Sequence, residues 1–87
     1  MDLLPLRLPP GADLRRSLEA TGMAHGFVVS GIGSLTDVHL RYAGAAQATL
    51  LAGDFEILSI AGALTADGAH LHMAVSDSSG RVYGGHV

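Results

Sequence analysis

The last third of the chain alternates apolar and polar side chains, and this pattern predicts a β-hairpin. Residues 70–76 carry an apolar side chain at every second position, which is the period of a half-buried strand. Residues 77–80, Asp-Ser-Ser-Gly, match a type I turn closed by glycine, which is typical of a three-residue hairpin loop with a bulge. That turn pairs His72 with His86 and places both, together with His70, on one face of the sheet.

A second hairpin is predicted just before the first. Residues 55–65 are rich in apolar and β-branched side chains, and the Asp-Gly pair at 67–68 is a strong two-residue turn signal. The resulting register places Ala63 opposite His72, so small side chains line the histidine face. The same alternation turns Glu56 toward the opposite, core face. That core face carries six larger apolar side chains: Leu58, Ile60, Leu64, Leu71, Met73 and Val75.

The rest of the chain predicts one helix and further strands. Residues 13–21 place two leucines four positions apart, on one face of a helix. Residues 3–8 predict a first strand, which Pro5 demotes toward a sheet edge. Consecutive strands joined by short turns imply an α+β fold, a largely antiparallel sheet with one helix packed on a face, in a single domain over residues 1–87. The remaining strands are expected at 26–32, 35–42 and 48–52, with a turn at Gly53-Asp54.

Composition favours a small domain that covers apolar surface between subunits. The chain has 87 residues, of which 48% are hydrophobic and only 15% charged. It lacks lysine and has a formal net charge of −3, which argues against strong DNA binding by this chain alone, because phosphate contacts need basic side chains. It has no cysteine, no signal-peptide pattern and no membrane-spanning apolar stretch, so we expect a cytoplasmic protein that does not associate with membranes.

Three runs of the sequence resemble the plants-and-prokaryotes-conserved (PPC) domain family, in its free-standing prokaryotic type. They are Gly-Asp-Phe-Glu-Ile-Leu-Ser-Ile-Ala-Gly at 53–62, Asp-Gly-Ala-His-Leu-His at 67–72 and Gly-Arg-Val-Tyr-Gly-Gly-His at 80–86. The resemblance implies a small α+β domain that forms homotrimers. In plants the domain follows AT-hooks in nuclear proteins that bind A·T-rich DNA, but this chain has no Arg-Gly-Arg-Pro string. Family domains usually continue for several strands past the Gly-Gly-His run, so we expect the family's last strands to be missing here.

His70, His72 and His86 form the best candidate site. Imidazole nitrogens suit zinc, and three protein ligands with one open position are a common exchangeable arrangement. A His-x-His pair on an exposed strand face can also be simple polar surface, and the residues alone favour that interpretation. Some prokaryotic members of the family that the chain resembles hold a metal through histidines like these, which favours a site for Zn²⁺ or another divalent metal. His25 and His39 lie outside this geometry.

Four other positions are expected to have structural or interface roles. Arg81, Gly84 and Gly85 belong to the last of the three runs, and Gly84 leaves space beside the histidines. Glu56 is either a partly exposed edge carboxylate or a partner of Arg41 or Arg81 across strands or subunits, because a buried carboxylate needs compensation.

These observations leave more than one class of function open. The first is a DNA-binding or regulatory module of the family, a homotrimer with a histidine metal site that reaches DNA only weakly or through partners. The second is a metal-dependent enzyme or small-molecule-binding protein that uses the face of His70, His72 and His86. A purely structural oligomerisation domain is the third. No serine has a neighbouring acid and base that would activate it, so no catalytic residue is assigned and an enzyme is disfavoured. No nucleic-acid-binding residue is identified.

Overall fold

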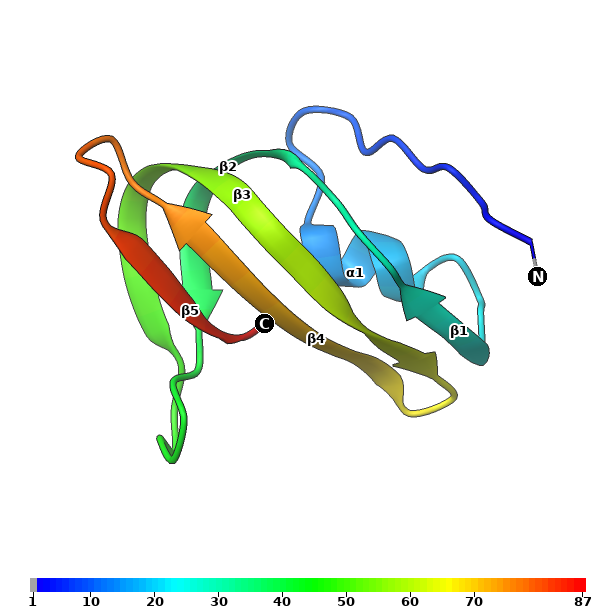
Figure 1. Cartoon of the computed structure of the whole chain (residues 1–87). Helices are drawn as coiled ribbons and strands as arrows, with labels where there is room; N and C mark the ends of the chain where they lie inside the picture. Colours follow the sequence, from blue (N-terminus) through cyan, green and yellow to red (C-terminus); the bar gives the residue numbers. More distant parts are fainter. Residues whose placement is uncertain (1) are drawn as a thin grey trace.

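The computed structural model describes residues 2–87, and this part of the chain forms an antiparallel sheet of five strands with one short helix (Figure 1). This architecture confirms the α+β class predicted from the sequence. In chain order the elements are α1 (Leu14–Glu19), β1 (His25–Val28), β2 (Gly33–Leu40), β3 (Thr49–Thr65), β4 (Gly68–Ser76) and β5 (Val82–His86).

Strand β3 is the centre of the sheet. It is 17 residues long, so its two halves can pair with different neighbours. Its first half pairs with β2 and its last four residues pair with β1, both along the same edge, whereas β4 pairs along the other edge. Strand β5 then pairs with the free edge of β4.

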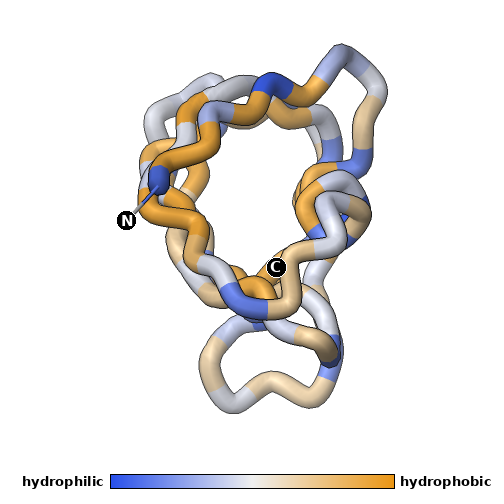
Figure 2. Tube along the Cα trace, turned by 90° about the vertical axis from the view of Figure 1, so that its right-hand side faces the viewer, coloured by the Kyte–Doolittle hydropathy of each residue, from blue (hydrophilic) through white to orange (hydrophobic). Residues whose placement is uncertain are grey.

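The end of β5 returns to the residue that follows β2 and closes the strands into a ring. The backbone N–H of Arg41 donates to the carbonyl of His86 at 2.9 Å, and the N–H of His86 donates to the carbonyl of Arg41 at 3.0 Å. Figure 2 shows the resulting ring-shaped outline of the trace. Glycine is required at position 85, because a Cβ there would lie 2.8 Å from the Arg41 carbonyl oxygen.

Alternate side chains of the strands point into the ring and form the core. Leu40, Leu71 and Val75 are completely buried, and Leu18 of α1 joins them at 7% exposure. Every second residue of β4 is therefore inside, as the alternation predicts, and the histidines between them are outside. The other buried members of this core are Val38, Phe55, Ile60, Leu64, Ala69 and Met73.

The helix is capped and tied to β4 by two carboxylates. Asp13 precedes the helix, and its Oδ1 accepts from the backbone N–H of Arg16 at 2.8 Å, as an N-cap residue does. The carboxylate of Glu19 accepts from the backbone N–H of Ala69 at 2.9 Å. The helix is shorter than the predicted span 13–21, since it ends at Glu19.

The β4–β5 hairpin has the predicted turn and register. His72 lies opposite His86, as the turn assignment required. Asp77 accepts through Oδ1 from the backbone N–H groups of Ser79 and Arg81, and Gly80 has a φ of 81°. The carboxylate therefore satisfies donors that the reversal of the chain leaves free.

The β3–β4 turn differs from the prediction by two residues. Thr65 pairs with Gly68, so Ala66 and Asp67 form the loop and Ala61, not Ala63, lies opposite His72. The Thr65 hydroxyl fixes this loop, because it accepts from the N–H of Asp67 and donates to the carbonyl of Gly68. A shift of two residues keeps each side chain on the same face, so the error in the turn does not change which residues share the histidine face.

The prediction that Glu56 and Leu58 point to the core face is wrong. The register between β3 and β4 shifts by one residue between Ile57 and Ser59, so Leu58 is an extra residue in the strand. Such a bulge exchanges the faces of the residues on one side of it. Glu56 is therefore exposed and Leu58 is 52% exposed, whereas Ile57 packs against the core.

Two further predictions about the strands are corrected. Residues 3–8 do not form a strand, since Pro5 and the prolines at 9 and 10 have no N–H to donate to a ladder. The predicted turn at Gly53-Asp54 is part of the continuous strand β3. There Asp37, at a φ of 56°, accepts from the N–H of Gly53 through its side chain, which bridges an irregular register without ending the strand.

We expect Gly80→Val to lower the free energy of unfolding by about 1–3 kcal/mol, because a β-branched residue is strained at a positive φ. Ser78→Ala, at an exposed position of the same turn, is the matched control and should change it by less than about 0.5 kcal/mol. Urea denaturation of both variants measures the difference. Equal stabilities would show that the turn is not formed as described.

Candidate functional site

The structure places all three predicted histidines on one outer face of the sheet, which we call the histidine face. His72 and His86 lie opposite each other on β4 and β5, and their ring centroids are 5.3 Å apart at an interplanar angle of 62°. His70 is two residues from His72 on β4 and points to the same side. His70 and His72 are exposed, and His86 is half-buried.

Small side chains surround the histidines and leave the face open. Ala61 lies opposite His72, and Ala63 lies opposite His70. On the far side of β3, Ala63 also faces Phe27 of β1, whose side chain is 80% exposed. The histidine face therefore continues into an uncovered aromatic side chain.

The environment of His86 favours its neutral form. Partial burial lowers the pKa of His86 below its usual value of 6.5, and the nearby positive charge of Arg41 lowers it further. His72, Arg15 and His70 act in the same direction. A neutral imidazole is the form that can donate a lone pair to a metal ion.

The three histidines are not gathered into one ready-made cluster. Within residues 2–87, no three His, Cys, Asp or Glu side chains are placed close enough to hold a metal ion together. The structure pairs His72 with His86 and leaves His70 one step along the strand. His25 and His39 lie on β1 and β2, outside this pair, as expected.

The four predicted structural positions have different surroundings. Gly85 is required by the ring closure, whereas a Cβ at Gly84 would make only an ordinary contact, 3.6 Å from the Met73 carbonyl oxygen. Arg81 is exposed, and its backbone N–H donates to the Asp77 carboxylate. Glu56 lies between Ser34 and Ser76 on the outer face, so it does not need the compensation expected for a buried carboxylate.

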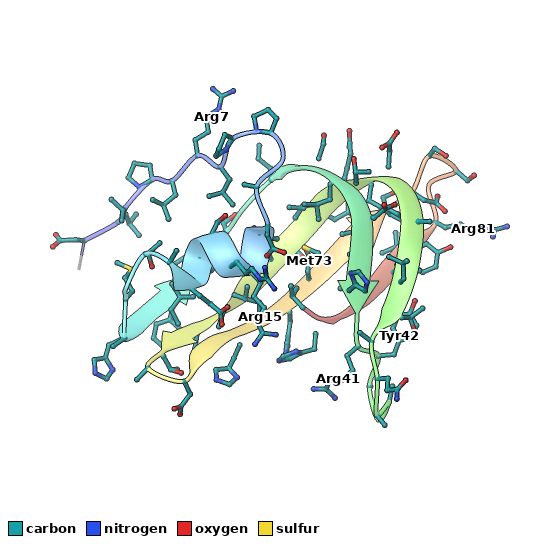
Figure 3. The ribbon with its side chains drawn as sticks, turned by 180° about the vertical axis from the view of Figure 1, so that it is seen from behind. Arg7, Arg15, Arg41, Tyr42, Met73 and Arg81 are labelled. Carbon is teal, nitrogen blue, oxygen red and sulfur yellow. The ribbon has the colours of Figure 1, made fainter. Side chains whose placement is uncertain are left out.

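The sequence pattern predicts no site role for Arg15, and for Arg41 it predicts only a pairing with Glu56. Both line a groove of about 790 Å³ between α1 and β2 that also reaches His86. Figure 3 shows Arg15 on α1, Met73 beside the helix and Arg41 beyond the end of β2. The alternating pattern of residues 35–42 marks Arg41 as outward-facing, but the pattern carries no signal for its pairing with β5.

The one helix of residues 2–87 is too short to cross a membrane.

Comparisons with known proteins identify relatives along nearly the whole chain. The family model of the Plants and Prokaryotes Conserved (PCC) domain matches residues 1–87. This is the family, abbreviated PPC above, that the three runs of the sequence resemble. Two proteins named bifunctional protein GlmU, from Synechococcus sp. strains JA-3-3Ab and JA-2-3B'a(2-13), are 46% and 42% identical to this chain over the matched residues. They match 95% and 100% of this chain, which spans only 14% of the length of either protein.

A solved structure shares the fold. It is that of a hypothetical protein from Salmonella cholerae-suis, which is 45% identical to this chain with a TM-score of 0.85. The match covers 94% of this chain and 62% of the Salmonella chain.

We expect NMR titration of the metal-free protein to give His86 a pKa below 6.5, and Arg41→Gln to raise it, because that change removes a positive charge that disfavours the imidazolium ion. Arg81→Gln, which removes the same charge elsewhere, is the control.

The same shift has a consequence for stability. The pKa of His86 is lower in the folded chain than in the unfolded chain, so the neutral imidazole is the form that the fold favours. The stability of the fold that depends on neutral His86 is therefore fully present above pH 6.5 and is lost as the pH falls from 6.5 through the folded pKa. A pKa for His86 at or above 6.5 in the folded protein would contradict both expectations.

Proposed function

Because this chain belongs to the Plants and Prokaryotes Conserved (PCC) domain family, we propose that it is a small homotrimeric binding module whose histidine face holds a divalent metal ion, with zinc as the best candidate. The observation that carries the proposal is the pairing of His72 with His86, with ring centroids 5.3 Å apart.

The donor set suits zinc. Zinc takes imidazole nitrogens as ligands at about 2.0–2.1 Å and commonly keeps one position open in exchangeable sites. Side chains two apart on a strand have Cβ atoms roughly 6.5–7 Å apart, so His70 reaches the space beside His72 when both imidazoles rotate toward it. A bound zinc ion would supply Lewis acidity, and its fourth position would take water or a group from a neighbouring subunit.

Exposed apolar side chains support the homotrimer. Phe27 is 80% exposed, Val82 60% and Leu58 52%. They lie on strands of the sheet, and Phe27 continues the row of Ala63 and His70. Large uncovered apolar side chains on the outside of a sheet favour contact with another protein surface. In a trimer these positions would be covered by neighbouring copies.

We propose that any contacts with DNA are weak or made through partners, because a net charge of −3 disfavours strong binding to phosphates. The proposed location of the protein is the cytoplasm. We also propose that α1 packs on a face of the sheet, which is supported by the burial of Leu18 and the bond from Ala69 to Glu19. The GlmU relatives contain the similar sequence in much longer chains, which fits a binding module that serves a larger protein.

A second candidate function is a small-molecule-binding protein. One observation favours it, namely the groove of about 790 Å³ that lies between α1 and β2 and reaches His86. Ligand sites in proteins typically have volumes of about 300–1,000 Å³, so the groove is large enough for a small organic molecule.

We expect calorimetric titration of metal-free protein with zinc to show one site per chain. His70→Ala, His72→Ala and His86→Ala should each weaken it by roughly tenfold or more, since loss even of a residue that supports a ligand commonly costs that much. The matched control is His39→Ala, an exposed histidine outside the face. Affinity for zinc should fall as the solution is made more acidic, because protonation of an imidazole removes the lone pair that binds the metal. Unchanged binding in all three variants would refute the metal site.

We expect light scattering at micromolar concentration to give the mass of a trimer. Phe27→Glu should shift the protein toward the monomer, because it places a charge where the proposed contact excludes water. Gln47→Glu adds the same charge at an exposed position of the loop between β2 and β3 and is the control. A monodisperse monomer of the unmodified chain would rule the trimer out for these 87 residues.

A further inference from the structure

The groove between α1 and β2 combines an apolar wall with basic side chains. Its apolar lining comes from Leu14, Leu35, Val38 and Met73, of which Val38 and Met73 are each 4% exposed. Leu14 and Leu35 are partly buried and pack against the core. Val38 and Met73 are thus already covered, and a ligand lying here would cover the remaining exposed surface of Leu14 and Leu35.

Three arginines line this groove, and Arg15 of α1 and Arg41 after β2 are the two tied to its His86 end. The third, Arg16, is exposed. Arg15 is held in place, since its Nη1 donates to the carbonyl of Val87 at 3.0 Å and its Nε lies 3.6 Å from the Glu19 carboxylate. Arg41 is much freer. The only hydrogen bond of its side chain within residues 2–87 joins Nη1 to the carbonyl of Ala45 at 3.4 Å, which leaves most of the guanidinium donors available.

The carboxylates that line the groove are already engaged by backbone groups. Asp13 caps α1, Glu19 accepts from the N–H of Ala69, and Asp37 accepts from the N–H of Gly53. At the His86 end of the groove, Arg41 pairs with His86 through its backbone and Arg15 donates to the carbonyl of Val87, so both guanidinium groups belong to this end. This end of the groove is therefore locally positive although the chain as a whole is acidic.

We propose that this groove binds a small organic anion, with a carboxylate or phosphate head held by Arg15 and Arg41 and an apolar body lying along Leu14 and Leu35. A guanidinium group binds either head group through two parallel charge-assisted hydrogen bonds. The apolar lining selects an amphipathic molecule over an inorganic ion. The site requires no metal and does not depend on the histidine face being a zinc site.

The test is calorimetric titration of chelator-treated, metal-free protein with n-octyl phosphate and with n-octanoate, below the concentrations at which they aggregate. Two further ligands isolate the chemistry: inorganic phosphate is the head group alone, and n-octylamine has a cationic head. We expect one site for an octyl anion, at least tenfold tighter than for inorganic phosphate and absent for octylamine. The octyl anion that binds more tightly identifies the preferred head group.

Three variants that each remove one positive charge test whether the octyl anion binds in the groove. Arg41→Gln and Arg15→Gln should each weaken octyl anion binding about tenfold or more. Arg81→Gln, at the far hairpin, should bind like the unmodified protein. If Arg15→Gln unfolds because it loses its bond to Val87, Arg41→Gln decides the question, since it removes only one long hydrogen bond. Equal binding of octyl anion and octylamine, or unchanged binding in Arg41→Gln, would overturn the proposal.

Discussion

The pair of backbone hydrogen bonds between Arg41 and His86 is the constraint on which the rest of the structure depends. A sheet of β2, β3, β4 and β5 without it would have two free edges and no defined inside. With it, alternate residues of each strand are sorted into a buried set around Leu40, Leu71 and Val75 and an outer set that includes the histidines. The strand length of β3 and the missing side chain of Gly85 are what allow the edges to meet.

The same closure places the chemical groups. It brings Arg41 beside His86 on one side, while the β4–β5 ladder holds His72 beside it on the other. His86 is therefore partly desolvated and faces positive charge, and both effects favour the neutral imidazole. His86 also lies at the boundary between the histidine face and the groove between α1 and β2. The two proposed sites therefore adjoin at His86 but bind different molecules.

The parts of this arrangement that depend on local chemistry could be predicted from the sequence. The Asp77 turn and the alternation of β4 give the correct partner for His86, because turn type and strand period together determine register. The prediction failed at Glu56, because a single inserted residue at Leu58 reverses the faces, and no residue type there signals a bulge. The pairing of Arg41 with His86 was also beyond prediction, since it joins residues that are distant in the chain and depends on how the whole of β3 bends.

Hydrogen exchange of backbone amides, followed by NMR in metal-free protein, tests the closure most directly. We expect the amides of Arg41 and His86 to be protected from exchange to the same degree as amides in the ladder between β3 and β4, because both sets open only when the ring opens. If these two amides exchange at the rate of an unfolded chain while the β3–β4 ladder remains protected, the ring is open in solution. The placement of His86 against both sites would then be wrong.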